Sequence, residues 1–130
     1  MSDAKLVHCA AVFLTENVER TAQYYQDILG FRVVTHYDQS EKFAALYRDE
    51  VEIVVVQARF GPVLANRQRY GAGYDAYLDP ETVEDVDSLY QEFRAKGAII
   101  LSPPALTPYG SYEFTLQDID SHQIVIGRIK

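Results

Sequence analysis

The sequence contains one local pattern twice. In each copy a polar residue precedes an amphipathic segment, a glycine ends it, and a short apolar run follows. The first copy covers residues 17–34 and turns at Gly30, and the second covers residues 85–101 and turns at Gly97. A polar N-cap and a terminal glycine are typical of a helix that leads into a strand. Two such units favour two half-domains that cover each other's apolar faces, with a cleft where a ligand can bind.

Apolar patterning around the two units predicts the order βαβββ in each half. We therefore expect one α+β domain over residues 1–130, in which paired βαβββ modules form antiparallel-rich sheets. The first module covers residues 5–57, a connector covers 58–72, and the second module covers 73–128. The predicted strands are residues 5–14, 31–37, 43–48, 51–57, 74–78, 98–101, 112–117 and 123–128, and the predicted second helix is 85–96.

Composition excludes several classes of partner. The chain of 130 residues has a formal net charge of −7, which repels phosphate backbones and argues against nucleic-acid binding. It has no apolar stretch near the ~20 residues that cross a bilayer, so we expect no membrane partner. The first residues lack the apolar core of a secretory signal, and Cys9 is the one cysteine. These features predict a cytoplasmic protein.

Several motifs together resemble the vicinal oxygen chelate superfamily. That group comprises glyoxalase I, bleomycin resistance proteins, extradiol dioxygenases and fosfomycin resistance enzymes. Two positions depart from its usual ending, since Ile119 replaces a proline and Ser121 a glycine. The resemblance implies two curved, partly open sheets around a cavity, and a homodimer. The motifs that carry it are Asn17-Val18, Tyr24-Tyr25 and Leu29-Gly30-Phe31, then Pro108-Tyr109-Gly110, Glu113-Phe114 and residues 118–125.

The resemblance also implies where a metal ion would bind. Enzymes of this group hold a divalent ion, which needs three or four converging N or O ligands with open coordination positions. The four equivalent positions fall on His8, Val54, Tyr74 and Val125. Valine offers no donor and a neutral tyrosine is a poor one, so His8 stands alone as a ligand. We therefore predict a protein that uses no metal and no other cofactor.

Two alternatives stay open. A shift of two residues keeps the same strand face and replaces the two valines by Glu52 and Gln123. With His8 these residues would give three donors, and the protein would be a metal-dependent lyase, isomerase or dioxygenase. In the other alternative, the domain is structural or regulatory and its cavity is vestigial.

The aromatic content suggests what a cavity would accept. Ten tyrosines and six phenylalanines fit a cavity that stacks a planar or cationic small molecule. The resemblance places the loop with Tyr109 over the second half's cavity, as a lid or wall, and Glu113 beside it as a cavity carboxylate. Sequestration of an antibiotic or toxic compound, in the manner of bleomycin resistance proteins, is the function we expect. The predicted ligand-binding residues are His8, Val54, Tyr74, Tyr109, Glu113 and Val125.

Overall fold

Two four-stranded mixed sheets and three helices make up the computed structural model, which describes residues 2–130. The predicted α+β class is confirmed, and strands Phe43–Arg48 and Val51–Gln57 have the predicted bounds. The first half contains β1 (Ala10–Thr15), α1 (Val18–Asp27), β2 (Arg32–His36), β3 (Phe43–Arg48) and β4 (Val51–Gln57). The rest contains α2 (Asn66–Tyr70), β5 (Ala76–Leu78), α3 (Glu84–Ala95), β6 (Ile99–Leu106), β7 (Ser111–Gln117) and β8 (Gln123–Ile129).

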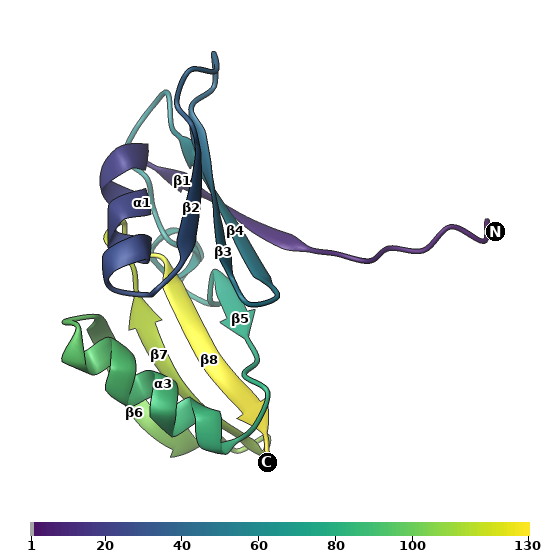
Figure 1. The fold of residues 1–130 in the computed structure, drawn as a ribbon. Coiled ribbons are helices and arrows are strands. Elements are labelled where there is room, and N and C mark those ends of the chain that lie inside the picture. Colours follow the sequence, from purple (N-terminus) through teal and green to yellow (C-terminus); the bar gives the residue numbers. More distant parts are fainter. Residues whose placement is uncertain (1) are drawn as a thin grey trace.

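The two sheets have the same connectivity. The first sheet has the order β1-β4-β3-β2, and the second has the order β5-β8-β7-β6. In each sheet the first strand pairs in parallel with the last, and the remaining pairs are antiparallel (Figure 1). The doubled pattern of the sequence therefore corresponds to a doubled topology.

Helix α1 shows how the local sequence sets the fold. The Asn17 side chain caps it by accepting the Arg20 backbone N–H at 3.1 Å. Gly30 follows the helix with a φ of 75°, a conformation that favours glycine. A Cβ at Gly30 would also lie 2.9 Å from Nη1 of Arg48, so a side chain there would have to displace the end of Arg48.

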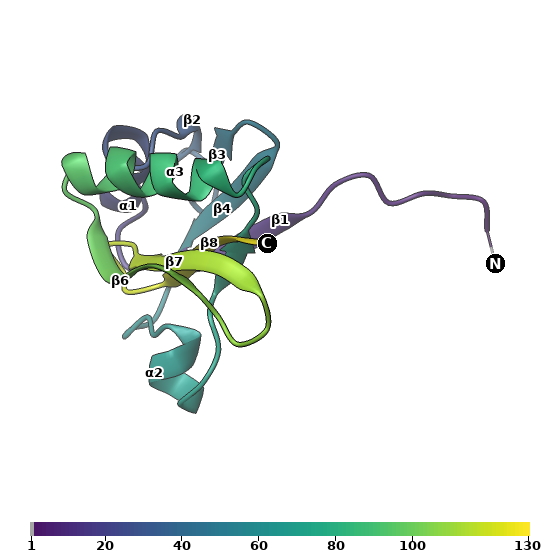
Figure 2. The ribbon, with the colours of Figure 1, turned by 90° about the horizontal axis from the view of Figure 1, so that it is seen from below.

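One hydrophobic core joins the two halves. It contains apolar side chains from α1, α3 and the face of each sheet that its helix covers. Helices α1 and α3 lie on the same side of the molecule, and α2 lies on the far side of the second sheet (Figure 2). Each sheet consequently has a second face that its own helix does not cover, which we call its open face. Core residues on the strands include Phe13, Leu46, Ile53, Val55, Phe114, Leu116, Ile124 and Ile126.

The predicted strand 5–14 is wrong in its first half. Strand β1 begins at Ala10, and residues 2–9 form an arm that extends away from the domain (Figure 1). Ala10 pairs with Glu52, close to the start of β4, so the strand has no neighbour to pair with before that point. Leu6 and Val7 are almost fully exposed on this arm.

Two more elements differ from the prediction. Strand β6 runs to Leu106 and includes Pro103 and Pro104, which the sequence assigned to a loop. It is an edge strand with two register irregularities, a setting in which proline is tolerated. The connector contains the short helix α2. Within residues 2–130, no helix has the length and apolar character needed to cross a membrane.

Candidate functional site

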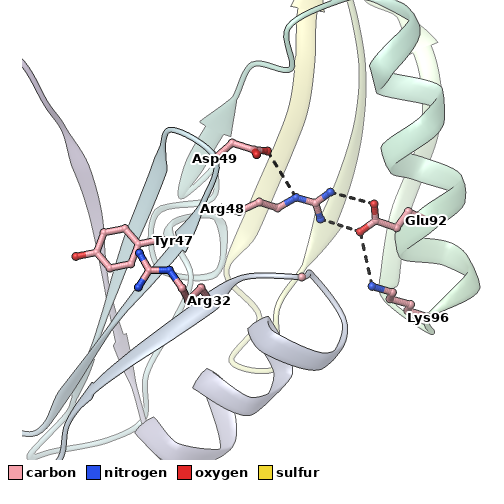
Figure 3. A pocket seen from close by; sticks show the side chains of 7 residues that line it. Arg32, Tyr47, Arg48, Asp49, Glu92 and Lys96 are labelled. Carbon is pink, nitrogen blue, oxygen red and sulfur yellow. Dashed lines mark hydrogen bonds and ion pairs between the residues drawn. The ribbon is translucent and has the colours of Figure 1, made fainter.

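The turn between β3 and β4 links the first half to α3 of the second. Arg48 donates from Nη1 and Nη2 to the Glu92 carboxylate, at 2.7 and 3.0 Å, and from Nη1 to the Leu29 carbonyl at 2.7 Å. Its hydrogen bonds to Glu92 lower the pKa of that carboxyl. Figure 3 shows Arg48 reaching across to Glu92, with Lys96 beside it. This cluster is an ion-pair network that holds the two halves together.

Two hollows surround this network. A groove of about 530 Å³ is lined by the network itself together with Arg32 and Tyr47, which point to the opposite side of the hairpin (Figure 3). A cleft of about 800 Å³ lies between the turn and α3, with a rim rich in carboxylates. Such a rim would suit a cationic ligand, but the central pair of the cleft, Arg48 and Glu92, is already mutually satisfied.

The turn between β7 and β8 contains three buried potential metal ligands, Asp118, Asp120 and His122. Oδ1 of Asp118 accepts the backbone N–H groups of Asp120 and His122, each at 2.9 Å. Its Oδ2 accepts the Tyr25 hydroxyl at 2.7 Å and lies 2.8 Å from Nδ1 of His122. Burial lowers the pKa of His122. The hydrogen bond to Asp118 and the charge of that carboxylate raise the pKa by more, so the net shift is upward. Ser121 takes the place of the usual glycine, and its φ of 71° is one that favours glycine.

Asp120 ties the same turn to the first half. Its Oδ2 accepts the hydroxyl groups of Thr15 and Thr21 at 2.7 and 2.6 Å, and its Oδ1 accepts from Arg20 at 3.3 Å. All four carboxylate oxygens of the cluster therefore have protein donors, which suits a structural network and does not suit a metal site. The open faces of the sheets are the remaining candidates.

On the first sheet, His8 contacts the residue that the two-residue shift introduced. Nε2 of His8 lies 2.6 Å from Oε1 of Glu52, at the point where the arm leaves β1. Val54 lies on the open face, flanked by Ala45 of β3 and Val12 of β1. Apart from the contact between His8 and Glu52, the centre of this face is therefore apolar, and Val12 is 60% exposed.

On the second sheet, the open face carries a carboxylate between two tyrosines. Glu113 of β7 is 8% exposed, and its Oε1 accepts the Tyr109 hydroxyl at 2.6 Å. The Tyr77 hydroxyl from β5 bonds to Ser111 at the start of β7. Tyr77 can lie near Glu113 because β8 places Gly127 opposite Glu113, and a glycine has no side chain to exclude the phenol.

These contacts leave one carboxylate oxygen unused. Oε2 of Glu113 is buried and has no hydrogen-bond partner among the described residues. Burial and the Glu113 carboxylate raise the pKa of the Tyr77 phenol, although its bond to Ser111 lowers it. The hydrogen bond to Glu113 likewise raises the pKa of Tyr109. Both phenols consequently remain protonated hydrogen-bond donors at neutral pH.

The predicted ligand-binding residues thus fall into two groups. His8 and Val54 belong to the first sheet, whereas Tyr109, Glu113 and Val125 belong to the second, with Tyr74 just before β5. The Tyr74 phenol is one of the groups that raise the pKa of Tyr109, and Val125 is fully buried. Sequence reasoning missed Tyr77, Ser111 and Gly127. Period-two alternation from Glu113 and Val125 would have placed Ser111 and Gly127 on the same face.

Comparison with known families assigns the class. The model of the Glyoxalase/Bleomycin resistance protein/Dioxygenase superfamily matches residues 5–126, so the chain belongs to this superfamily. No curated protein matches the chain.

Solved structures share the fold at low sequence identity. A glyoxylase/bleomycin resistance protein/dioxygenase domain from Frankia sp. EAN1pec has a TM-score of 0.74 and 19% identity, over 99% of this chain and 100% of that chain. TioX from Micromonospora sp. ML1 has a TM-score of 0.69 and 18% identity, over 95% and 99% of the two chains. A glyoxalase/bleomycin resistance protein/dioxygenase from Nocardioides has a TM-score of 0.70 and 16% identity, over 97% and 85%.

Proposed function

We propose that this protein binds a small molecule on its open faces without a metal ion, and sequesters an antibiotic or toxic compound. The observation that carries the proposal is the chemistry of the positions where the superfamily resemblance places metal ligands. Val54 and Val125 have no donor atom, and Tyr74 is a neutral phenol. The open face of the second sheet instead offers aromatic side chains around Glu113, a combination that suits binding of an organic molecule.

A metal-dependent lyase, isomerase or dioxygenase is the second candidate. The contact between His8 and Glu52 favours it, because imidazole and carboxylate are both common metal ligands. The third donor required by this alternative, Gln123, lies in β8 of the other sheet. With two ligands on one face, the site needs at least one more donor before it can hold an ion for catalysis.

We also propose a homodimer in the cytoplasm. The arm carries Leu6 and Val7 with almost no covering, and Phe60 of the connector is 88% exposed near β1. Large apolar side chains that are exposed to this extent are often covered at a protein–protein interface. A second copy of the chain would cover them, and a reduced Cys9 fits the cytoplasm.

Elemental analysis of protein purified without a metal-affinity tag tests the first candidate against the second. We expect no stoichiometric divalent metal in the wild type or in His8→Ala. A stoichiometric ion that disappears in His8→Ala would contradict binding without a metal ion and favour the metal-dependent enzyme. Thermal-shift screening against aromatic and cationic compounds tests binding itself. If no compound stabilises the fold at concentrations far above its expected Kd, the cavity is vestigial.

Light scattering after size-exclusion chromatography tests the dimer. We expect the wild type to have twice the mass of the chain and the double variant Leu6→Ser, Val7→Ser to dissociate. A monomeric wild type would contradict the proposal.

A further inference from the structure

The carboxylate of Glu113 has neither a complete set of donors nor a counter-ion. Glu113 is 8% exposed, and its Oε2 has no hydrogen-bond partner within residues 2–130. No lysine, arginine or histidine of the described chain forms an ion pair with it, in contrast to Glu52 and Glu92. A buried acceptor without a donor costs on the order of 1–3 kcal/mol, so native proteins seldom keep one unless it has a role.

The backbone around Glu113 is shaped to hold this arrangement. Gly127 lies directly opposite Glu113 in the β7–β8 ladder. A Cβ at Gly127 would lie 2.5 Å from Cβ of Glu113 and 2.6 Å from the Tyr77 hydroxyl, so any other residue would displace both side chains. Glycine inside a strand weakens it, and often marks a close approach by another group. Gly127 therefore leaves space on β8 for the Glu113 carboxylate and the Tyr77 phenol.

Two tyrosines from different segments approach the carboxylate, Tyr77 from β5 and Tyr109 from the turn between β6 and β7. Tyr77 and Tyr109 are 43% and 62% exposed. The Tyr109 hydroxyl donates to Glu113, and its backbone lies in the turn between Thr107 and Gly110. Outward rotation of Tyr109 would break this hydrogen bond and free Oε1 of Glu113 for a ligand.

Together these features specify the charge of the ligand. We propose that Glu113 is the anchor for a protonated amine, whose N–H groups bond to the carboxylate while Tyr77 and Tyr109 flank the cation. An ammonium supplies both the missing donor and the missing positive charge, and tyrosine faces attract cations. A divalent metal fits less well, because among the described residues Glu113 belongs to no group of three potential metal ligands, and the protonated phenols are donors. This inference rests on the proposed small-molecule function and names the chemistry of its ligand.

Isothermal titration with two compounds of nearly the same shape tests the anchor. The probes are 2-phenylethylamine, which is cationic at neutral pH, and 2-phenylethanol, which is neutral. For the wild type we expect the amine to bind at least about tenfold more tightly, the size of one charge-assisted hydrogen bond. Glu113→Gln should abolish this preference, and Glu41→Gln, which removes the same charge at an exposed position, should retain it.

A second variant keeps the test informative if Glu113→Gln does not fold. Tyr109→Phe keeps the aromatic wall but removes the hydroxyl that competes for Glu113, so the amine should bind more tightly than to the wild type. Equal binding of the two probes to the wild type would overturn the amine anchor and leave small-molecule binding intact. Loss of amine binding in Tyr109→Phe would also overturn it. Failure of these probes and of every neutral aromatic compound would contradict both proposals.

Discussion

The two halves of the molecule share a topology, but the carboxylates on their open faces have different hydrogen-bond partners. On the open face of the first sheet, Glu52 contacts His8 of the arm, and the face around Val54 is apolar. On the open face of the second sheet, Glu113 contacts the Tyr109 hydroxyl and keeps one oxygen without a partner. The two open faces of the doubled fold therefore differ, because the carboxylate on the first contacts an imidazole and the carboxylate on the second keeps an oxygen without a hydrogen-bond partner. We expect a ligand to bind on the second open face, where a hydrogen-bond acceptor is still available.

The β3–β4 and β7–β8 turns differ in the opposite sense, because the more completely hydrogen-bonded turn belongs to the second half. In the first half, Arg48 and Glu92 form a solvent-accessible pair, with side chains 25% and 33% exposed. In the second half, Asp118 is fully buried and all its oxygen positions are used. The half with the unsatisfied open face thus has the more firmly bonded turn. Each turn contacts the helix of the other half, so both contribute to holding the halves together.

The largest expected effect concerns these turns. Asp118→Ala removes the acceptor for Tyr25, His122 and two backbone N–H groups, and should lower the free energy of unfolding by about 3–5 kcal/mol. Glu92→Gln breaks the exposed pair, and should lower it by about 1 kcal/mol or less. Urea denaturation of both variants measures the difference. Similar losses would show that burial does not distinguish the two turns.

Gly127→Ala should have the next largest effect. Its new Cβ overlaps Glu113 and Tyr77, so the free energy of unfolding should fall by about 1–3 kcal/mol, as in other overpacked sites. The same variant should lose binding of 2-phenylethylamine, because the carboxylate is displaced. Thermal unfolding and titration measure the two effects. Wild-type behaviour in both would mean that the open face tolerates a side chain at this position.

The pH dependence should separate the halves further. His122 has a raised pKa in the folded state, so its contribution to stability is complete below its unfolded pKa of about 6.5. That contribution is lost as the pH rises through the raised folded value. The difference in unfolding free energy between wild type and His122→Gln should therefore shrink from about pH 6 to about pH 8. A difference that stays constant or grows would mean that Asp118, Asp75 and Asp120 do not favour the imidazolium.

The smallest effects should have opposite signs on the two open faces. Glu113→Gln removes an uncompensated buried charge, so the melting temperature of the ligand-free protein should stay the same or rise. Glu52→Gln removes the partner of His8 at a partly exposed position, so stability should fall by about 1 kcal/mol or less. Differential scanning calorimetry compares the two. A clear loss in Glu113→Gln would show that Glu113 is satisfied in the ligand-free protein.

Local patterns in the sequence predicted the fold well and the site in part. Cap, glycine and alternation placed both long helices and most strands, because these signals act over a few residues. The arm was missed because an apolar run such as Lys5–Leu14 becomes a strand only where a neighbour can pair with it. Glu113 and Tyr109 were proposed together from the resemblance. Tyr77 could not be, because only strand register brings β5 beside β8 and β7 there.

The central claim is that the second open face binds an amine through Glu113 without a metal ion. The most direct measurement is calorimetric titration of 2-phenylethylamine in the presence of EDTA, for wild type, Glu113→Gln and Glu52→Gln. We predict that the chelator leaves wild-type affinity unchanged, that Glu113→Gln loses binding, and that Glu52→Gln keeps it. Binding that EDTA abolishes, or that depends on Glu52 in place of Glu113, would contradict the account.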